Sequence, residues 1–154
     1  MIVYPNAKIN IGLNVLEKRA DGYHELSSLF YPVKNLCDIL EISPSTEFYF
    51  SSSGIAIPDE GNICIKAFKI LKQDFEISNI KIHLHKQIPV GAGLGGGSAD
   101  GAFMLKAIDT LFNLKLSTSQ LEKYALQLGA DCPFFIENTP KYVQGIGEKM
   151  LSVD

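Results

Sequence analysis

Apolar and polar residues alternate along two stretches of the chain. Over residues 7–15 the apolar side chains fall on the odd positions, and Lys8 and Asn10 share the opposite, polar face. Over residues 80–88 the even positions are isoleucine or leucine except for Lys86, which lies near the end of the stretch. A period of two predicts half-buried strands. A lysine on the apolar face of the second strand either extends its ammonium group towards solvent or binds an anion.

Three further stretches have the period of a helix. Asn62 is a helix-capping residue type, and the apolar positions that follow it recur on one helical face. A second helix is expected over residues 97–113, with one broad apolar side. Ser117 and Gln120 have the spacing of a capping box at the start of a third helix, which Gly129 would end.

The order of the expected elements indicates the fold class. Further strands are expected at 23–33, 38–42, 47–51 and 141–153. Strands therefore dominate the first half of the chain, and two consecutive helices follow. This order predicts an α+β fold in which helices pack on a mostly antiparallel sheet. A length of 154 residues fits one domain that spans residues 1–154.

Composition and charge exclude several classes of partner. The net charge is −3, with 46% hydrophobic and 20% charged residues. There is no basic footprint for nucleic acid and no polybasic membrane patch, so neither partner is expected. No stretch is long and apolar enough for a membrane span, and the N-terminus does not resemble a signal peptide. Three cysteines without metal-binding spacing predict reduced thiols in a cytoplasmic protein. The oligomeric state stays open.

The stretch VGAGLGGGSADGAFML, which begins at Val90, has five glycines between Gly91 and Gly97. A Walker A loop would need a lysine directly after the glycines, and none follows before Lys106. Gly91, Gly93 and Gly96 do match the dinucleotide fingerprint G-x-G-x-x-G. That fingerprint belongs to a strand–helix–strand unit with a parallel sheet, whereas here a helix is expected to follow the first helix. A dinucleotide site is therefore the weaker hypothesis.

A long glycine arch that enters a helix directly is the design we favour. Successive backbone N–H groups of such an arch form an anion nest, and the helix N-terminus adds partial positive charge. Ser98, in the first helical turn, is able to donate to a phosphate oxygen or to ligate Mg²⁺. Asp100 either belongs to the same site or merely suits the helix dipole. The loop is therefore expected to bind phosphate.

Four motifs carry a resemblance to a known family. PVGAGLGGGSADGA (89–102) resembles the second motif of the GHMP kinases. PNAKINIGLNVLEKRADGYHELSSLF (5–30), LGADCPFF (128–135) and GIGE (145–148) are similar to the branch that phosphorylates a cytidylyl-methylerythritol alcohol. The resemblance covers essentially the whole chain. It implies a GHMP-kinase N-terminal domain with the ribosomal protein S5 domain 2-like fold, a mixed sheet packed with helices.

The same resemblance implies an activity and its small-molecule partners. The cofactors would be ATP and Mg²⁺, and the reaction would transfer the γ-phosphoryl group to the 2-hydroxyl of 4-diphosphocytidyl-2-C-methyl-D-erythritol, a step of non-mevalonate isoprenoid biosynthesis. Another GHMP kinase, of homoserine or mevalonate type, is the alternative within the family. A nucleotide-binding module without turnover is the alternative outside it.

Roles for single residues follow from the resemblance alone. Asp131 would be the catalytic base that takes the hydroxyl proton, and Lys8 would keep it ionised and offset charge on the phosphoryl group. The expected substrate-binding residues are Asn10, Tyr23, His24 and Phe30. The expected ATP-binding residues are Asn62, Lys86, Pro89, Gly91, Gly93, Leu94, Gly95, Gly96, Gly97 and Ser98, with Ser98 also the candidate Mg²⁺ ligand. A C-terminal GHMP domain is expected to be absent from these 154 residues, so turnover by this chain alone is in question.

Overall fold

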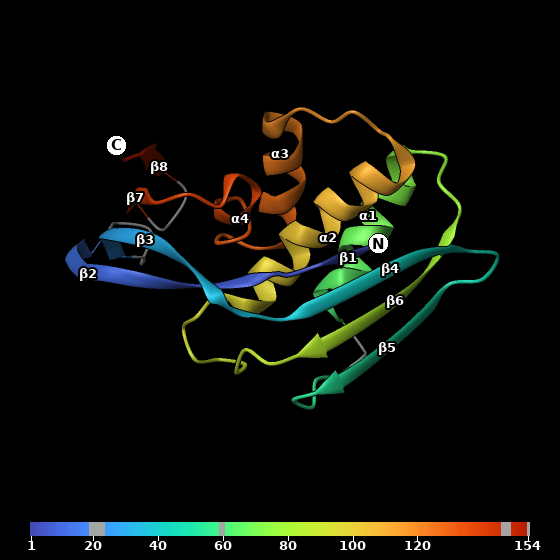
Figure 1. The fold of residues 1–154 in the computed structure, drawn as a ribbon. Helices are drawn as coiled ribbons and strands as arrows, with labels where there is room; N and C mark the ends of the chain where they lie inside the picture. Colours follow the sequence, from blue (N-terminus) through green and yellow to red (C-terminus); the bar gives the residue numbers. More distant parts are fainter. Residues whose placement is uncertain (19–23, 59–60, 146–148, 154) are drawn as a thin grey trace.

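The computed structural model describes residues 1–18, 24–58, 61–145 and 149–153. Two four-stranded sheets lie end to end, and the helices cover one side of them (Figure 1). The strands are β1 (Ile2–Val3), β2 (Asn6–Lys18), β3 (His24–Cys37), β4 (Ile39–Ser45), β5 (Tyr49–Gly54), β6 (Asn79–Lys86), β7 (Lys141–Gly145) and β8 (Lys149–Ser152). The helices are α1 (Ile63–Asp74), α2 (Gly96–Phe112), α3 (Thr118–Leu128) and α4 (Phe134–Glu137).

The strand pairing confirms the α+β class. One sheet has the order β1-β4-β6-β5 and the other β2-β3-β7-β8. Every pair in these sheets is antiparallel except β5 with β6. The helix α2, which follows the glycine loop, is succeeded by α3 rather than by a parallel strand. This topology contradicts the dinucleotide-binding hypothesis, which needs a strand at that point.

The helix boundaries follow the capping residues. Asn62 caps α1 by accepting a hydrogen bond from the backbone N–H of Cys64 at 2.9 Å. The capping box of Ser117 and Gln120 is formed at the start of α3, which ends just before Gly129. The helix α2 begins at Gly96, one residue earlier than expected. None of the four helices in the described part of the chain reaches the length and hydropathy needed to cross a bilayer.

The core lies between the helices and the inner face of β4 and β6. Alternate residues of these two strands point into it, as the alternation over residues 80–88 predicted for β6, and Lys86 joins them at 3% exposure. The largest fully buried side chains are Phe134, Phe135, Leu40, Ile42, Leu71, Ile80, Ile82, Leu84, Ile88, Met104, Leu105 and Ile108. Since β6 and α2 both contribute to this core, the loop that joins them is held at its two ends.

The strand β2 does not bury its apolar face in the way that the alternation predicts. Ala7 is buried, but Ile9 and Ile11 on the same face are exposed, and on the polar face Lys8 is buried while Asn10 is exposed. Lys8 is only 3% exposed, whereas Ile9 and Ile11 are 39% and 47% exposed. The glycine loop lies against the side chain of Lys8, and this contact covers that one polar position. A register shift between Asn6 and Ala7 also interrupts the pairing with β3 just before this point.

Candidate functional site

The glycine loop alternates between left-handed and ordinary backbone. Gly91, Gly93 and Gly95 have φ of 75°, 74° and 70°, and the residues between them are not in the left-handed region. Such alternation turns successive N–H groups towards one side and makes an anion nest. Gly95 also caps α2, a helix of 17 residues, whose first unpaired N–H groups and dipole continue the nest. The loop is therefore built for close approach by a phosphate group.

At Gly95 a side chain would clash with its neighbours. A Cβ atom there would lie 2.9 Å from Cγ of Lys8 and 3.0 Å from Cζ of Phe135. The absence of a side chain lets the stem of Lys8 run directly over the loop. The backbone N–H of Lys8 also donates to the carbonyl oxygen of Leu94 at 2.8 Å, so β2 and the loop are joined.

The side chain of Lys8 gathers three residues expected in the site. Its Nζ lies 3.3 Å from Oδ2 of Asp131 and donates to Oδ1 of Asn10 at 2.7 Å. The same ammonium group lies 4.4 Å from the ring centre of Phe30, within the range of a cation–π contact. The Asp131 side chain is 34% exposed and that of Lys8 only 4%, so the carboxylate faces solvent while the lysine is covered.

Asp131 is held by the turn that joins α3 to α4. The backbone N–H of Cys132 donates to the carbonyl of Gly129, and Lys106 donates to two carbonyl oxygens of α4. At the end of α4, Asn138 donates to Oδ1 of Asn6 at 2.6 Å, which ties this segment to β2 just before Lys8. These contacts bring the carboxylate and the ammonium group together, although they are far apart in the sequence.

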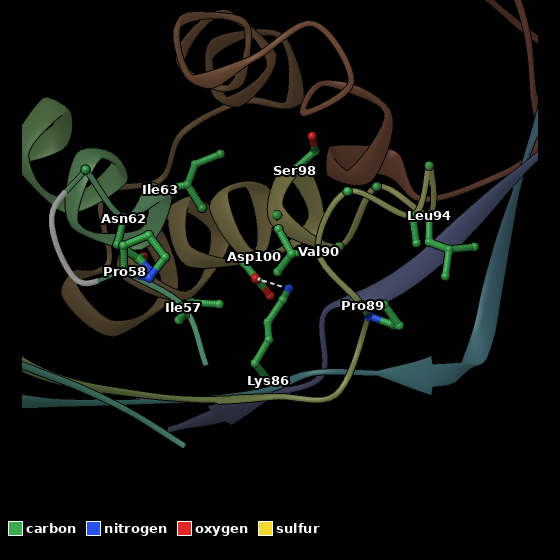
Figure 2. Close-up of a pocket in the computed structure, with 17 residues that line it drawn as sticks. Ile57, Pro58, Asn62, Ile63, Lys86, Pro89, Val90, Leu94, Ser98 and Asp100 are labelled. Carbon is green, nitrogen blue, oxygen red and sulfur yellow. Dashed lines mark hydrogen bonds and ion pairs between the residues drawn. The ribbon is translucent and has the colours of Figure 1, made fainter. Parts of the chain in front are cut away.

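Ser98 lies on the Asp131 side of the loop. Figure 2 shows its side chain pointing away from Lys86 and Asp100. Burial raises the pKa of the Cys132 thiol to about 11, and a hydrogen bond with Ser98 acts in the opposite direction. Since Cys132 follows Asp131 directly, the Ser98 hydroxyl lies near the carboxylate end of the site.

Lys86 lies under the loop, and its charge is already balanced. Its Nζ donates to Oδ2 of Asp38 at 2.5 Å and to Oδ2 of Asp100 at 2.7 Å. Lys86, Asp38 and Asp100, called here the buried trio, are 3%, 0% and 2% exposed. Burial alone would lower the pKa of Lys86, but the two carboxylates outweigh it and raise that pKa.

The pKa of one carboxyl group of the buried trio is raised above its usual range. Burial is the largest cause that raises the pKa of Asp100, to about 8; the ammonium group of Lys86 opposes this rise and the Asp38 carboxylate adds to it. Lys86 still donates to Oδ2 of Asp100, while Oδ1 of Asp100 is buried and lacks a hydrogen-bond partner among the described residues.

The expected nucleotide residues line one pocket. Lys86, Asn62, Pro89 and the loop up to Ser98 surround it, together with Ile57 and Pro58. In Figure 2, Asn62 and Pro58 lie on one side of Lys86, and Leu94 lies on the other. The structure thus brings the expected ATP-binding residues together around this pocket, whose lining does not include Lys8 and Asp131. Tyr23 lies outside the residues that the structure describes. His24 is the first residue of β3, and only its backbone is described.

Sequence reasoning missed two residues that organise the site. Asp38 separates β3 from β4 and reaches Lys86, and Asn138 ends α4 in a left-handed conformation at φ 56°. Neither belongs to a motif that the sequence shows. The one available signal for Asp38 was the lysine on an apolar strand face, because a buried ammonium group requires a carboxylate partner.

Comparison with known proteins identifies the family. The family model described as the GHMP kinases N terminal domain matches residues 62–138, half of the chain. The chain belongs to the GHMP kinase family. The matched segment begins at the cap of α1, includes the glycine loop and ends at the cap of α4, so it contains most of the pocket and Asp131.

Several relatives of this GHMP kinase domain bear one name. A 4-diphosphocytidyl-2-C-methyl-D-erythritol kinase of Azobacteroides pseudotrichonymphae is 52% identical and covers 100% of the chain, which corresponds to 58% of that protein. The enzyme of the same name from Bacteroides fragilis is 51% identical, with 100% and 58% covered. The chain thus spans somewhat more than half the length of the curated relatives that it matches.

Solved structures agree on the fold. The crystal structure of a 4-(cytidine 5'-diphospho)-2C-methyl-D-erythritol kinase superposes with a TM-score of 0.87 at 34% identity, covering 99% of this chain and 55% of that one. The mevalonate kinase of Methanococcus jannaschii has a TM-score of 0.74 at 16% identity, covering 100% and 56%. The second likeness shows the shared fold alone.

Proposed function

We propose that this chain is the ATP-binding, N-terminal domain of a kinase that phosphorylates the 2-hydroxyl of 4-diphosphocytidyl-2-C-methyl-D-erythritol. The observation that carries the proposal is the pair of Lys8 and Asp131, 3.3 Å apart, beside the glycine loop. Phosphoryl transfer depends mainly on positioning and on neutralisation of charge, and these residues supply both. The names of the relatives support the choice of substrate.

Each side chain has a defined part in the proposed reaction. Asp131 accepts the proton of the attacking hydroxyl group, because its carboxylate is 34% exposed and therefore accessible to a substrate. Lys8 holds that carboxylate ionised and stabilises charge on the transferred phosphoryl group. Asn10, which already bonds to Lys8, positions the hydroxyl group. By the family resemblance, Phe30 forms a wall of the substrate pocket, and Tyr23 and His24 stack on and hydrogen-bond the cytosine.

Mg²⁺ fits the site as an ion held mainly by the nucleotide. The described part of the chain holds no group of three or more His, Cys, Asp or Glu side chains that could enclose a metal ion. Mg²⁺ characteristically keeps water and phosphate oxygens as ligands and takes only one or two from a protein. Ser98 would supply one oxygen, and the ion would neutralise phosphate charge when bound.

Turnover by the longest form of the protein that its gene encodes tests the proposal. ADP release is measured with the cytidylyl substrate, with homoserine and with mevalonate, at matched concentrations of ATP and Mg²⁺. We expect ADP release with the cytidylyl substrate and a far lower value of kcat/KM with the other two. A preference for homoserine or mevalonate would contradict the substrate assignment while keeping the kinase activity.

A second candidate is a nucleotide-binding module without turnover. The length of the chain favours it for the isolated domain, because 42% of the length of the relatives is not matched. Calorimetry of the 154-residue chain with a non-hydrolysable ATP analogue distinguishes the candidates. Binding without ADP release by either form of the protein would support the module, and absence of binding would contradict both candidates.

A further inference from the structure

The glycine loop begins and ends at two points that touch each other. A Cβ atom at Gly96, the first residue of α2, would lie 2.8 Å from Cγ2 of Ile88 and 3.1 Å from Nζ of Lys86. Residues 89–95 therefore leave and re-enter the fold at one place, as an Ω-loop does. Whatever fixes the distance between Ile88 and Gly96 also fixes the width of the arch above them.

The buried trio crosses the base of this loop. Lys86 is the last residue of β6, on the N-terminal side of the loop, and Asp100 lies in α2 on its C-terminal side. Their bond of 2.7 Å, drawn in Figure 2, joins the two sides directly. We propose that Lys86 and Asp100 are positioning residues, which set the shape of the loop for phosphate binding by bonding across its base.

Asp38 completes the anchor on the N-terminal side. Its Oδ2 accepts from Lys86, and its Oδ1 accepts from the backbone N–H groups of Gln87 and Ile88 at 2.6 and 2.9 Å. Its own N–H donates to the carbonyl oxygen of Pro5 at 2.8 Å, at the start of the segment that carries Lys8. The anchor therefore connects the base of the loop with the strand of the catalytic pair.

The physical reason for such an anchor is the glycine content of the loop. Glycine has the largest backbone conformational freedom of all residues. Part of this conformational entropy would be lost when the loop is ordered around a phosphate. A loop whose ends are already fixed loses less entropy when it binds, so its affinity is higher. Because Nζ of Lys86 is held by two carboxyl groups, Lys86 acts through the loop rather than on the ligand. This inference rests on the proposed nucleotide-binding function of the loop.

Substitution of Asp100 tests the inference with little risk to the fold. Asp100→Ala removes the bond across the base but leaves Lys86 paired with Asp38, a balanced pair of charges. Asp100→Asn keeps an oxygen that accepts from Lys86. Asp109→Ala is the matched control. Asp109 lies towards the other end of α2, and its Oδ1 accepts a hydrogen bond from the backbone N–H of Leu116 at 3.0 Å. Affinity for a non-hydrolysable ATP analogue is measured by calorimetry, and amide hydrogen exchange of residues 87–97 is measured without ligand.

We expect Asp100→Ala to lower the affinity about tenfold and to speed exchange in the loop. Asp100→Asn and Asp109→Ala should stay within about threefold of the wild type. If the affinity and the loop exchange rates of Asp100→Ala equal those of the wild type, the inference is overturned. If the wild type itself does not bind the analogue, the proposed function fails, and the exchange measurement alone decides on the anchor. If Asp100→Ala does not fold, hydrogen exchange of the wild type decides. The backbone amides of Gln87 and Ile88 are then expected to exchange as slowly as those of β6. Exchange of these two amides as fast as at the centre of the loop would contradict the anchor.

Discussion

Two buried lysines lie on opposite sides of one glycine loop, and their surroundings differ. Lys8 and Lys86 are both 3% exposed. Lys8 has one carboxylate partner, Asp131, whose side chain is 34% exposed. Lys86 has two, which are almost completely buried. Each ammonium group has two polar partners, but that of Lys8 pairs with one partly exposed carboxylate, whereas that of Lys86 is enclosed by two buried carboxyl groups.

The comparison also separates two ways in which a protein uses positive charge near an anion site. In the proposed reaction, Lys8 shares its charge with the partly exposed carboxylate of Asp131, the proposed base, and in this way contributes to the chemistry. The charge of Lys86 is cancelled inside the protein and leaves the backbone N–H groups of the loop as the anion donors on its side. Residue type and burial are the same at both positions, and only the partners differ.

We expect the largest effect on activity from a substitution of Asp131, the partly exposed carboxylate that is the proposed base. Asp131→Asn keeps the shape of the side chain but removes its capacity to take a proton. In the longest form of the protein we expect kcat to fall by about 10²–10⁴-fold, the usual contribution of a general base, with little change in nucleotide affinity. Steady-state kinetics with calorimetry checks both values. An unchanged kcat would remove Asp131 from the reaction.

Removal of each ammonium group should affect stability very differently. Lys86→Met leaves two carboxyl groups buried without their cation, which costs about 3–5 kcal/mol of unfolding free energy. Lys8→Met leaves the partly exposed Asp131 to be solvated, so we expect a loss of only about 1 kcal/mol or less. Urea denaturation of the two variants measures this difference. Equal losses would show that the two environments are alike.

The excess carboxyl group of the buried trio predicts a dependence on pH. The pKa of Asp100 is raised to about 8 in the folded protein, so folding takes up a proton between the ordinary aspartate pKa and 8. The folded state binds more protons there, and the unfolding free energy must fall as the pH rises. Relative to Asp100→Asn, the wild type should lose about 2–3 kcal/mol between pH 5 and pH 7. Urea denaturation at several pH values measures it, and a constant difference would mean that Asp100 is ionised throughout.

The smallest effect concerns the glycine that lies under Lys8. Gly95→Ala forces a left-handed alanine and places its Cβ 2.9 Å from Cγ of Lys8, at a cost of about 1–2 kcal/mol. Gly97→Ala is the matched control, since its Cβ would meet nothing within 4 Å in the first turn of α2. Thermal unfolding should separate the two variants. A stability of Gly95→Ala equal to that of Gly97→Ala would contradict the close packing of Lys8 on the loop.

Much of the fold could be predicted from the sequence, because its signals are local. The alternation of residues 80–88 and the caps at Asn62 and Ser117 depend on neighbours a few residues away, and the structure has these elements. Alternation along β2 located the strand but did not tell which face is covered. Ile9 and Ile11 are exposed, whereas Lys8 is covered because the glycine loop, far along the chain, lies against its side chain.

The site was predictable only in part for the same physical reason. The glycine pattern indicates an anion nest by itself, but the contact between Lys8 and Asp131 depends on the turn before α4 and was expected only from a family resemblance. Asp38 was not expected at all, because its contacts with Lys86, Gln87 and Ile88 join a strand junction to the end of another strand. Long-range partners of this kind leave no periodic signal.

A crystal structure with a non-hydrolysable ATP analogue tests the central claim most directly, since it shows which lysine turns to the ligand. The account predicts phosphate oxygens at the N–H groups of the glycine loop and within hydrogen-bonding distance of Nζ of Lys8. It also predicts that Nζ of Lys86 keeps both carboxyl partners. A phosphate bound to Nζ of Lys86, with its bond to Asp100 broken, would contradict the account.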